Sequence, residues 1–366
     1  MSETILKEEE RVAYALRSLY RQYGYLPYKM SKFEAYDLYV ANKDFLVGDG
    51  VITFNDTDGK LLALKPDVTL SIIKNTSDEN GKQKVYYHEN VYRISGETKQ
   101  FKEIPQVGLE CIGDIGVYDL FETLRLAAES LNVISSDFVL DISHLGILSA
   151  TLEDINCGNS FNREIMHLLA EKNLHETVSL CEKYGVNQNQ TENLLTIVRT
   201  YGDMSSTLER LESLCVTEKA KAAYAELKTL YALLTSCGYG DKIRLDFSVV
   251  NDMKYYNGIV FKGFVSGICE GVLSGGQYDK LMARMHRKAG AIGFAVYLDL
   301  LQDFKKQKTA YDVDVLVLYD KDTNIKILVD TVSEITKKGK SVNVRKYADK
   351  VRYNEITDLR KGGENV

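Results

Sequence analysis

A carboxylate and a hydroxyl stand two residues apart in LALKPDVTLSI, residues 62–72, where Asp67 precedes Thr69. An ammonium group brings three hydrogen-bond donors and no acceptor, so an acid beside a hydroxyl suits it as a binding site. The same residues also fit an ordinary helix start, because an acid just after Pro66 interacts favourably with the helix dipole. Taken alone, this segment leaves both interpretations open.

A second group of polar residues falls on two segments that alternate like β-strands. Arg93 belongs to KVYYHENVYRI, residues 84–94, while Gln106 and Glu110 lie in IPQVGLECIGD, residues 104–114. Residues four apart on a strand point to one face, so Gln106 and Glu110 share a side. Burying such groups is costly without partners. A ligand would provide them, and a structural ion pair between Arg93 and Glu110 is the alternative.

Two further segments carry aromatic residues and glycines. Tyr255 and Tyr256 occur in VVNDMKYYNGIVF, residues 249–261, and alone they fit a strand with one ring on each face. The glycines of LSGGQYDKL, residues 273–281, would let the backbone approach a ligand closely. Both segments are compatible with a ligand pocket, although neither specifies one by itself.

Composition excludes several classes of protein. The 366 residues are 45% hydrophobic and 27% charged, which is ordinary for a globular chain. There is no signal-peptide pattern and no apolar run of about 18 residues. The six cysteines form no CxxC pair, so we expect reduced thiols in a cytoplasmic protein, with no metal and no cofactor. The net charge of −6 disfavours binding to tRNA and other nucleic acids.

The order of elements predicts an α+β fold, with helices flanking an antiparallel sheet. Asp58-Gly59 predicts a hairpin turn. We expect a core over residues 1–304, with a helical insertion at about 145–236, and a small α/β module over 313–366. Strands are expected at 84–94, 104–114, 138–143, 243–250, 255–265, 268–276, 313–319 and 341–347. Helices are expected at 4–22, 66–75, 117–131, 278–285, 294–304 and 323–338.

In their order and spacing, the four segments resemble the histidine-type class II aminoacyl-tRNA synthetases. They match that family's LRPEGT segment, motif 2, RGLxYYxGxVF segment and AGGRYDGL segment, and the match spans residues 10–304. The resemblance implies a class II synthetase-like antiparallel sheet and a histidine site. The implied ligands are Asp67, Thr69, Arg93, Gln106, Glu110, Tyr255 and Tyr256.

The resemblance also implies a role for most of these side chains. Asp67, Thr69 and Glu110 would take the ammonium of histidine. Arg93 would take its carboxylate, and Tyr256 would face the imidazole.

The departures from the family pattern fall where ATP would be activated. Leu300 and Asn251 stand at two positions where these synthetases carry arginine, and Ile104 replaces a phenylalanine that stacks on adenine. Tyr297 replaces a small glycine. Losing one group that stabilises a charged transition state typically costs about 2.7–4 kcal/mol. The pattern therefore predicts a retained amino-acid site beside a degenerate ATP site.

Such losses are typical of a synthetase paralogue, the regulatory subunits of short-form ATP phosphoribosyltransferase. This resemblance implies a non-catalytic subunit for the first step of histidine biosynthesis. It implies a homodimer within a hetero-octamer, a short catalytic subunit as partner, histidine as feedback inhibitor and no tRNA. The tail, residues 313–366, resembles a truncated anticodon-binding module. The alternatives are a divergent histidyl-tRNA synthetase or another amide-forming ligase of class II type.

Overall fold

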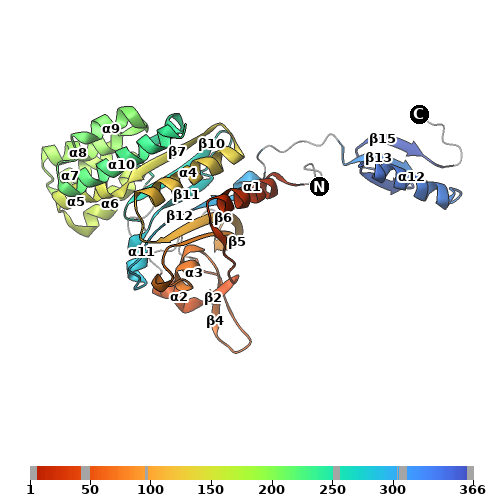
Figure 1. The fold of residues 1–366 in the computed structure, drawn as a ribbon, viewed down its shortest axis with the longest axis horizontal. Coiled ribbons are helices and arrows are strands. Elements are labelled where there is room, and N and C mark those ends of the chain that lie inside the picture. The colour runs from red at the N-terminus through yellow and green to blue at the C-terminus, as the bar shows by residue number, and fades with distance from the viewer. Residues whose placement is uncertain are drawn as a thin grey trace. The chain divides into compact units, whose positions relative to one another are not determined.

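The chain divides into two compact units, Met1–Phe304 and Lys305–Val366. A computed structural model describes residues 6–42, 50–94, 98–249, 256–302, 304 and 311–360. None of the helices in these ranges has the length and apolarity needed to cross a membrane. Figure 1 shows both units with their elements labelled.

A mainly antiparallel sheet of nine described strands forms the centre of the first unit. Its strand order is β1-β5-β6-β12-β11-β10-β7-β9-β8, with parallel pairing at β1–β5 and β7–β9. This arrangement confirms the predicted antiparallel sheet. The strands are β1 (Leu26–Pro27), β5 (Gln83–Ile94), β6 (Phe101–Gly113), β7 (Phe138–His144), β8 (Tyr201–Asp203), β9 (Ile243–Asp246), β10 (Ile259–Val265), β11 (Leu273–Gln277) and β12 (Gly290–Tyr297).

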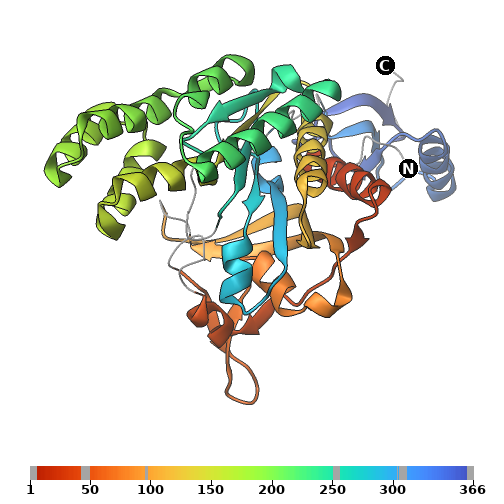
Figure 2. The same cartoon turned by 60° about the vertical axis from the view of Figure 1, so that its left-hand side comes forward.

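Helices α1 (Glu8–Gln22) and α4 (Val117–Ile134) cover one face of the sheet, as Figures 1 and 2 show. The apolar side of α1 is buried, and the Tyr20 ring packs edge-on against Phe294 of β12 at 5.9 Å between centroids. Burying a large apolar side chain stabilises the fold by roughly 1.5–3 kcal/mol. This core occupies one face, so the alternate residues of the central strands point to the opposite face.

The opposite face carries a second, smaller core, which includes Ile72, Tyr87 and Leu281. Strands β3 and β4 form the hairpin predicted at Asp58-Gly59, and Gly59 has a φ of +80°, which glycine adopts without steric cost. The elements here are β2 (Phe33–Ala35), α2 (Tyr36–Ala41), β3 (Thr53–Asn55), β4 (Leu61–Leu64), α3 (Thr69–Lys74), a short 3-10 helix (Asp78–Asn80) and α11 (Asp279–Arg284).

Between β7 and β9 the chain forms the predicted helical insertion, interrupted only by β8 among its described elements. Side-chain caps begin several of its helices, since Asn173, Asn187, Asp203 and Thr217 each accept a backbone N–H of the first turn. Its helices are α5 (Leu145–Ile155), α6 (Gly158–Ala170), α7 (Leu174–Tyr184), α8 (Gln188–Arg199), α9 (Met204–Glu212) and α10 (Glu218–Ser236), followed by a 3-10 turn (Gly240–Lys242).

The helix predicted over residues 294–304 is wrong. This part of the chain continues β12 to Tyr297 and then makes a 3-10 turn, Leu298–Leu301. The strand pairs with β6 on one side and β11 on the other, and Phe294 and Val296 alternate into the core. Pairing on both edges therefore overrides the helical pattern of the isolated segment.

In the second unit, β13 (Val313–Leu318) lies between β14 (Val342–Arg345) and β15 (Tyr353–Asp358), and all three run parallel. Helix α12 (Ile325–Lys337) joins the first two strands, and Asn324 caps it. The strand, helix and strand predicted over 313–347 are present. Val315, Leu316, Val317 and Leu318 form the buried centre of this unit.

Candidate functional site

Glu110 is the centre of a polar group on the sheet face opposite α1 and α4. Its carboxylate accepts a hydrogen bond from the Thr69 hydroxyl at 2.8 Å and one from the Tyr278 hydroxyl at 2.5 Å. Gly293 lies directly across the ladder, and a Cβ there would come within 1.7 Å of Glu110 Oε2. The glycine therefore leaves the space that this side chain occupies.

The electrostatics of Glu110 differ from those of a surface acid. Burial raises the pKa of Glu110 to about 8, because water is excluded from its charged form. The hydroxyls of Tyr278 and Thr69 oppose this rise, while the neighbouring Asp67 carboxylate adds to it. A carboxyl group that titrates near neutrality is typical of binding and catalytic sites.

Asp67 stands at the start of α3, close to Arg93. The Asp67 Oδ1 atom accepts the backbone N–H of Leu70 at 2.9 Å, so the acid does cap the first helical turn. Burial raises the pKa of Asp67, while the Leu70 N–H and the Arg93 charge oppose that rise. Arg93 Nε donates to the Pro66 carbonyl at 2.9 Å, and no other hydrogen bond joins its guanidinium to a described residue. The remaining donors of Arg93 can take a ligand carboxylate.

Tyr256 and Gln106 complete the part of the predicted site that is described. The Tyr256 ring lies over Gly276, since a Cβ there would be 2.7 Å from a ring carbon. Burial raises the pKa of Tyr256, and Tyr297 and Glu110 add to that rise. Gln106 is buried on β6, on the same face as Glu110, as its spacing predicted. The predicted ligand Tyr255 lies outside the described residues, as does Asn251.

A cavity of about 390 Å³ borders this group at Arg93. Ile104 and Leu300 both line it, so two of the three positions predicted as degenerate meet there. The Tyr297 side chain also lines it, with its hydroxyl 2.6 Å from Ser274 Oγ. The remaining lining residues are Lys102, Lys262, Phe264, Cys269, Glu270, Gly271 and Asp299.

Sequence reasoning gave no role to Tyr278, although the residue lies inside the quoted LSGGQYDKL segment. Its hydroxyl is one of the two partners of Glu110, and the residue is buried. The available signal was its position directly after β11, two residues beyond the glycines of that strand. A tyrosine there begins the turn into α11, which carries its ring back over the sheet face.

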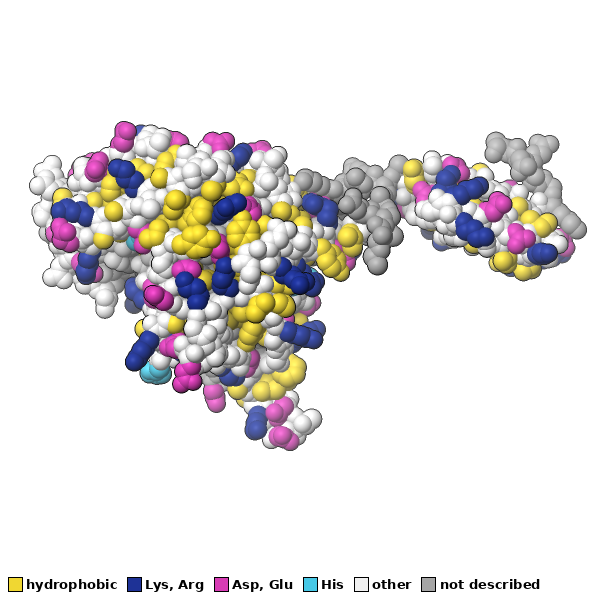
Figure 3. Space-filling view, viewed as in Figure 1, with side chains coloured by type: hydrophobic (Ala, Val, Ile, Leu, Met, Phe, Trp, Pro, Cys, Tyr) yellow, Lys and Arg dark blue, Asp and Glu magenta, His cyan; other side chains and the backbone are white. Residues whose placement is uncertain are grey.

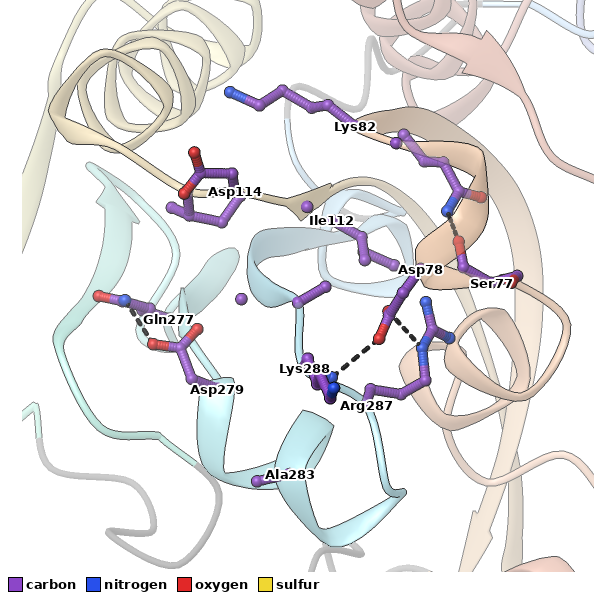
Figure 4. Close-up of a pocket in the computed structure, with 16 residues that line it drawn as sticks. Ser77, Asp78, Lys82, Ile112, Asp114, Gln277, Asp279, Ala283, Arg287 and Lys288 are labelled. Atoms are coloured by element: carbon purple, nitrogen blue, oxygen red, sulfur yellow. Dashed lines mark hydrogen bonds and ion pairs between the residues drawn. The ribbon is translucent and has the colours of Figure 1, made fainter.

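A second cavity, of about 690 Å³, lies at the other ends of β5, β6 and β12, and Figure 4 shows its lining. Its charged groups are largely paired within the protein. Asp78 accepts from Arg287 Nε at 2.6 Å, and Asp279 accepts from the Gln277 amide at 2.7 Å. None of the predicted ligands lines this cavity, and the described residues contain no cluster of metal-ligating side chains.

Comparisons with known proteins identify the family of the chain. The family model for histidyl-tRNA synthetase matches residues 2–301. Curated relatives named ATP phosphoribosyltransferase regulatory subunit include one from Oceanobacillus iheyensis, 29% identical, covering 78% of this chain and 71% of its own length. Another, from Clostridium kluyveri, is 27% identical and covers 91% of this chain and 88% of its own length.

Solved structures agree in fold. A protein from Bacillus halodurans, described as an ATP phosphoribosyltransferase regulatory subunit/histidyl-tRNA synthetase, superimposes with a TM-score of 0.79 at 24% identity. The match covers 96% of this chain and 94% of that one. A chain of an ATP phosphoribosyl transferase complex from Thermotoga maritima gives 0.64 at 19% identity, with 79% and 97% covered.

Fold and site together define a protein of the class II aminoacyl-tRNA synthetase type, with a buried polar cluster around Glu110 on the sheet face opposite α1 and α4. Because the family model spans most of its length, the chain belongs to the histidyl-tRNA synthetase family.

Proposed function

We propose that this chain is the non-catalytic regulatory subunit of a short-form ATP phosphoribosyltransferase, which performs the first step of histidine biosynthesis. It is required for activity of the catalytic subunit and for feedback inhibition by histidine. The names of its relatives support this role. The observation that carries it is the contrast between the buried polar cluster around Glu110 and the apolar Ile104 and Leu300 in the cavity that borders it at Arg93.

The pocket around Glu110 is the proposed histidine site. Asp67, Thr69 and Glu110 take the ammonium, since together they offer acceptors to a group with three donors. Arg93 takes the carboxylate with its two terminal guanidinium nitrogens, since its Nε donates to the Pro66 carbonyl. Tyr256 faces the imidazole. Gln106 lines the same face, and Tyr255 is retained as a proposed ligand although it lies outside the described residues.

The proposed absence of catalysis rests on the neighbouring cavity. A transition state at an ATP phosphate gathers negative charge, and an arginine held there would supply about 2.7–4 kcal/mol. Leu300 brings no charge to that cavity, and the Tyr297 ring fills part of it. Besides Arg93, two lysines line the cavity: Lys102 is paired with Asp299 at 2.8 Å, and Lys262 lies over the Phe264 ring at 5.4 Å from its centroid. Asn251 is the third position that we propose as degenerate.

A cytoplasmic homodimer within a hetero-octamer is the proposed assembly, with the short catalytic subunit as partner and no tRNA. The net charge of −6 supports the exclusion of tRNA. On the face in Figure 3, basic and acidic side chains are interspersed and form no continuous basic stripe. We propose that residues 313–366 are a truncated anticodon-binding module that has lost tRNA recognition.

Reconstitution tests this function. The chain and a short-form catalytic subunit should co-purify, and phosphoribosyl transfer should need both and fall when histidine is added. The chain would act by binding the active state of its partner more tightly than the inactive one. A catalytic subunit that runs at full rate alone, and ignores this chain, would contradict the proposal.

A second assay distinguishes the proposed regulatory subunit from the alternative, a divergent histidyl-tRNA synthetase. The purified chain should show no histidine-dependent exchange between ATP and pyrophosphate and no charging of tRNA. Exchange clearly above background, in protein free of host synthetase, would favour the alternative.

Mutation of Glu110 tests where histidine binds. Feedback coupling is typically about 1–3 kcal/mol, which changes activity roughly 5–150-fold. Glu110→Ala should weaken inhibition by histidine more than basal activation, because it removes an acceptor for the ammonium. Glu164→Ala, which removes an acid from the distant insertion, is the matched control. Equal inhibition constants for wild type and Glu110→Ala would place the regulatory site elsewhere.

A further inference from the structure

Glu110 differs from most buried acids in the partners that it has. Buried carboxylates usually pair with a cation, because an unpaired charge is costly away from water. Here both carboxyl oxygens contact hydroxyls, Thr69 on Oε1 and Tyr278 on Oε2. No described lysine, arginine or histidine makes an ion pair with Glu110. Among the described residues, the charged form is therefore stabilised by hydrogen bonds and not by an ion pair.

The other ionisable groups around Glu110 do not replace the missing cation. Asp67, before α3, is an acid and disfavours a second negative charge. Tyr87 on β5 and Tyr256 before β10 are neutral phenols whose pKa values are raised by burial and by Glu110. On the β12 side stands Gly293, which has no side chain. The described cations Arg93 and Lys65 both act on Asp67, and Arg93 also acts on Tyr256.

Hydroxyl partners have a property that backbone N–H groups and arginine lack. A hydroxyl can donate to a carboxylate, or rotate and accept from a carboxylic acid. Thr69 and Tyr278 can therefore keep Glu110 hydrogen-bonded in either charge state. Asp67 is different, since the Leu70 N–H that it accepts can only donate and so favours the anion. The geometry around Glu110 is thus suited to a group that changes its charge in place.

We infer that Tyr278 is a positioning residue of the histidine site, which keeps Glu110 in place in either charge state, and that Glu110 is a neutral acid which loses its proton when a ligand ammonium binds. This inference rests on the proposed histidine site. The ammonium brings the missing cation, the O–H bond of the acid breaks, and its proton passes to solvent. The carboxylate then accepts from the ammonium, and Tyr278 and Thr69 both donate to it.

The direction of the pH dependence follows. The pKa of Glu110 in the empty pocket is about 8, raised mainly by burial. An adjacent positive charge lowers the pKa of a carboxyl group by about 1–3 units. Because Glu110 loses its proton on binding, the affinity for histidine is highest above the pKa of Glu110 in the free protein. It falls as the pH drops from that value towards the lower pKa of Glu110 in the complex. The total loss is roughly 10–1000-fold.

The primary test is calorimetric titration of L-histidine into the full chain, in buffers that differ in ionisation enthalpy. At pH 7 we expect roughly 0.4–0.9 proton released for each histidine bound. Glu110→Gln lacks the titrating carboxyl group, while the titration of the ligand itself is the same in both proteins. The difference in protons released between wild type and this variant therefore isolates the contribution of Glu110. Wild-type binding without proton release overturns the inference. No binding at any pH instead overturns the proposed histidine site.

Tyr278→Phe separates positioning from simple structural support. The Tyr278 hydroxyl lowers the pKa of Glu110, so this variant should have a higher pKa at Glu110. As the pH is raised, its affinity for histidine should therefore increase at a higher pH than the affinity of the wild type does. The deficit relative to wild type should be larger near pH 6.5 than near pH 9. Tyr184→Phe is the matched control, because its hydroxyl donates to Glu164 at 2.9 Å in the insertion, and its profile should match wild type. A deficit of equal size at every pH would mean that Tyr278 only supports the fold.

Discussion

At Gly293, the absence of a side chain leaves room for the Glu110 carboxylate, whose Oε2 would lie 1.7 Å from an added Cβ. Gly293→Ala should therefore force Glu110 out of its bonds with Thr69 and Tyr278. Overpacking of this kind costs about 1–3 kcal/mol of stability. We expect histidine binding, measured by calorimetry, to weaken by at least about tenfold, equivalent to about 1.4 kcal/mol.

Gly116→Ala provides the comparison for that variant. Its Cβ would meet its nearest heavy atom at 3.9 Å, and its φ of −110° suits any residue. Histidine affinity should be unchanged. If Gly293→Ala binds histidine as tightly as Gly116→Ala, then Glu110 does not contribute to the ligand site.

Individual residues of the pocket were predictable where strand alternation fixes direction. Gln106 and Glu110 share a face because they are four residues apart on β6. Arg93 lies on β5, the strand that pairs with β6. Tyr278 was not predictable in this way. Its contact with Glu110 joins residues 168 apart in sequence, through a turn between β11 and α11 that no local periodicity specifies.

Among the elements, the error at residues 294–304 has a physical cause. Small and apolar residues in GFAVYLDLL fit both a helix and a strand buried on both edges. Pairing with β6 and β11 decides between them, and those strands lie far away in the sequence. The helices of the insertion were easier to predict, because local caps and helical spacing act within each segment.

Helix α10 offers a test of these local signals. Thr217 Oγ1 accepts the backbone N–H of Ala220 at 3.2 Å and so caps the first turn. Thr217→Ala should lower the free energy of unfolding by about 1 kcal/mol, within a usual range of 0.5–2. Urea denaturation followed by circular dichroism would measure it. Thr217→Ser keeps the hydroxyl and should remain near wild type, and an equal loss in both variants would show that the cap is not the cause.

At the scale of the whole molecule, the two units differ in what they contribute. All the described residues of the proposed histidine site belong to Met1–Phe304. The two hydrophobic clusters of that unit also contain no residue beyond Phe304. The second unit has its own buried strand, β13. The larger unit therefore holds both the pocket and the packing that supports it.

A chain ending at residue 304 should fold and bind histidine. The hydrophobic clusters described in the larger unit contain no residue of the smaller one, and independent sites usually couple by no more than about 0.5 kcal/mol, so the dissociation constant should change by roughly twofold at most. Calorimetry on the shortened and full chains, with thermal unfolding of both, would measure this. The shortened chain carrying Glu110→Ala is the control and should lose binding. If the shortened chain folds cooperatively yet fails to bind histidine, residues after 304 contribute to the site, and the pocket around Glu110 is not sufficient.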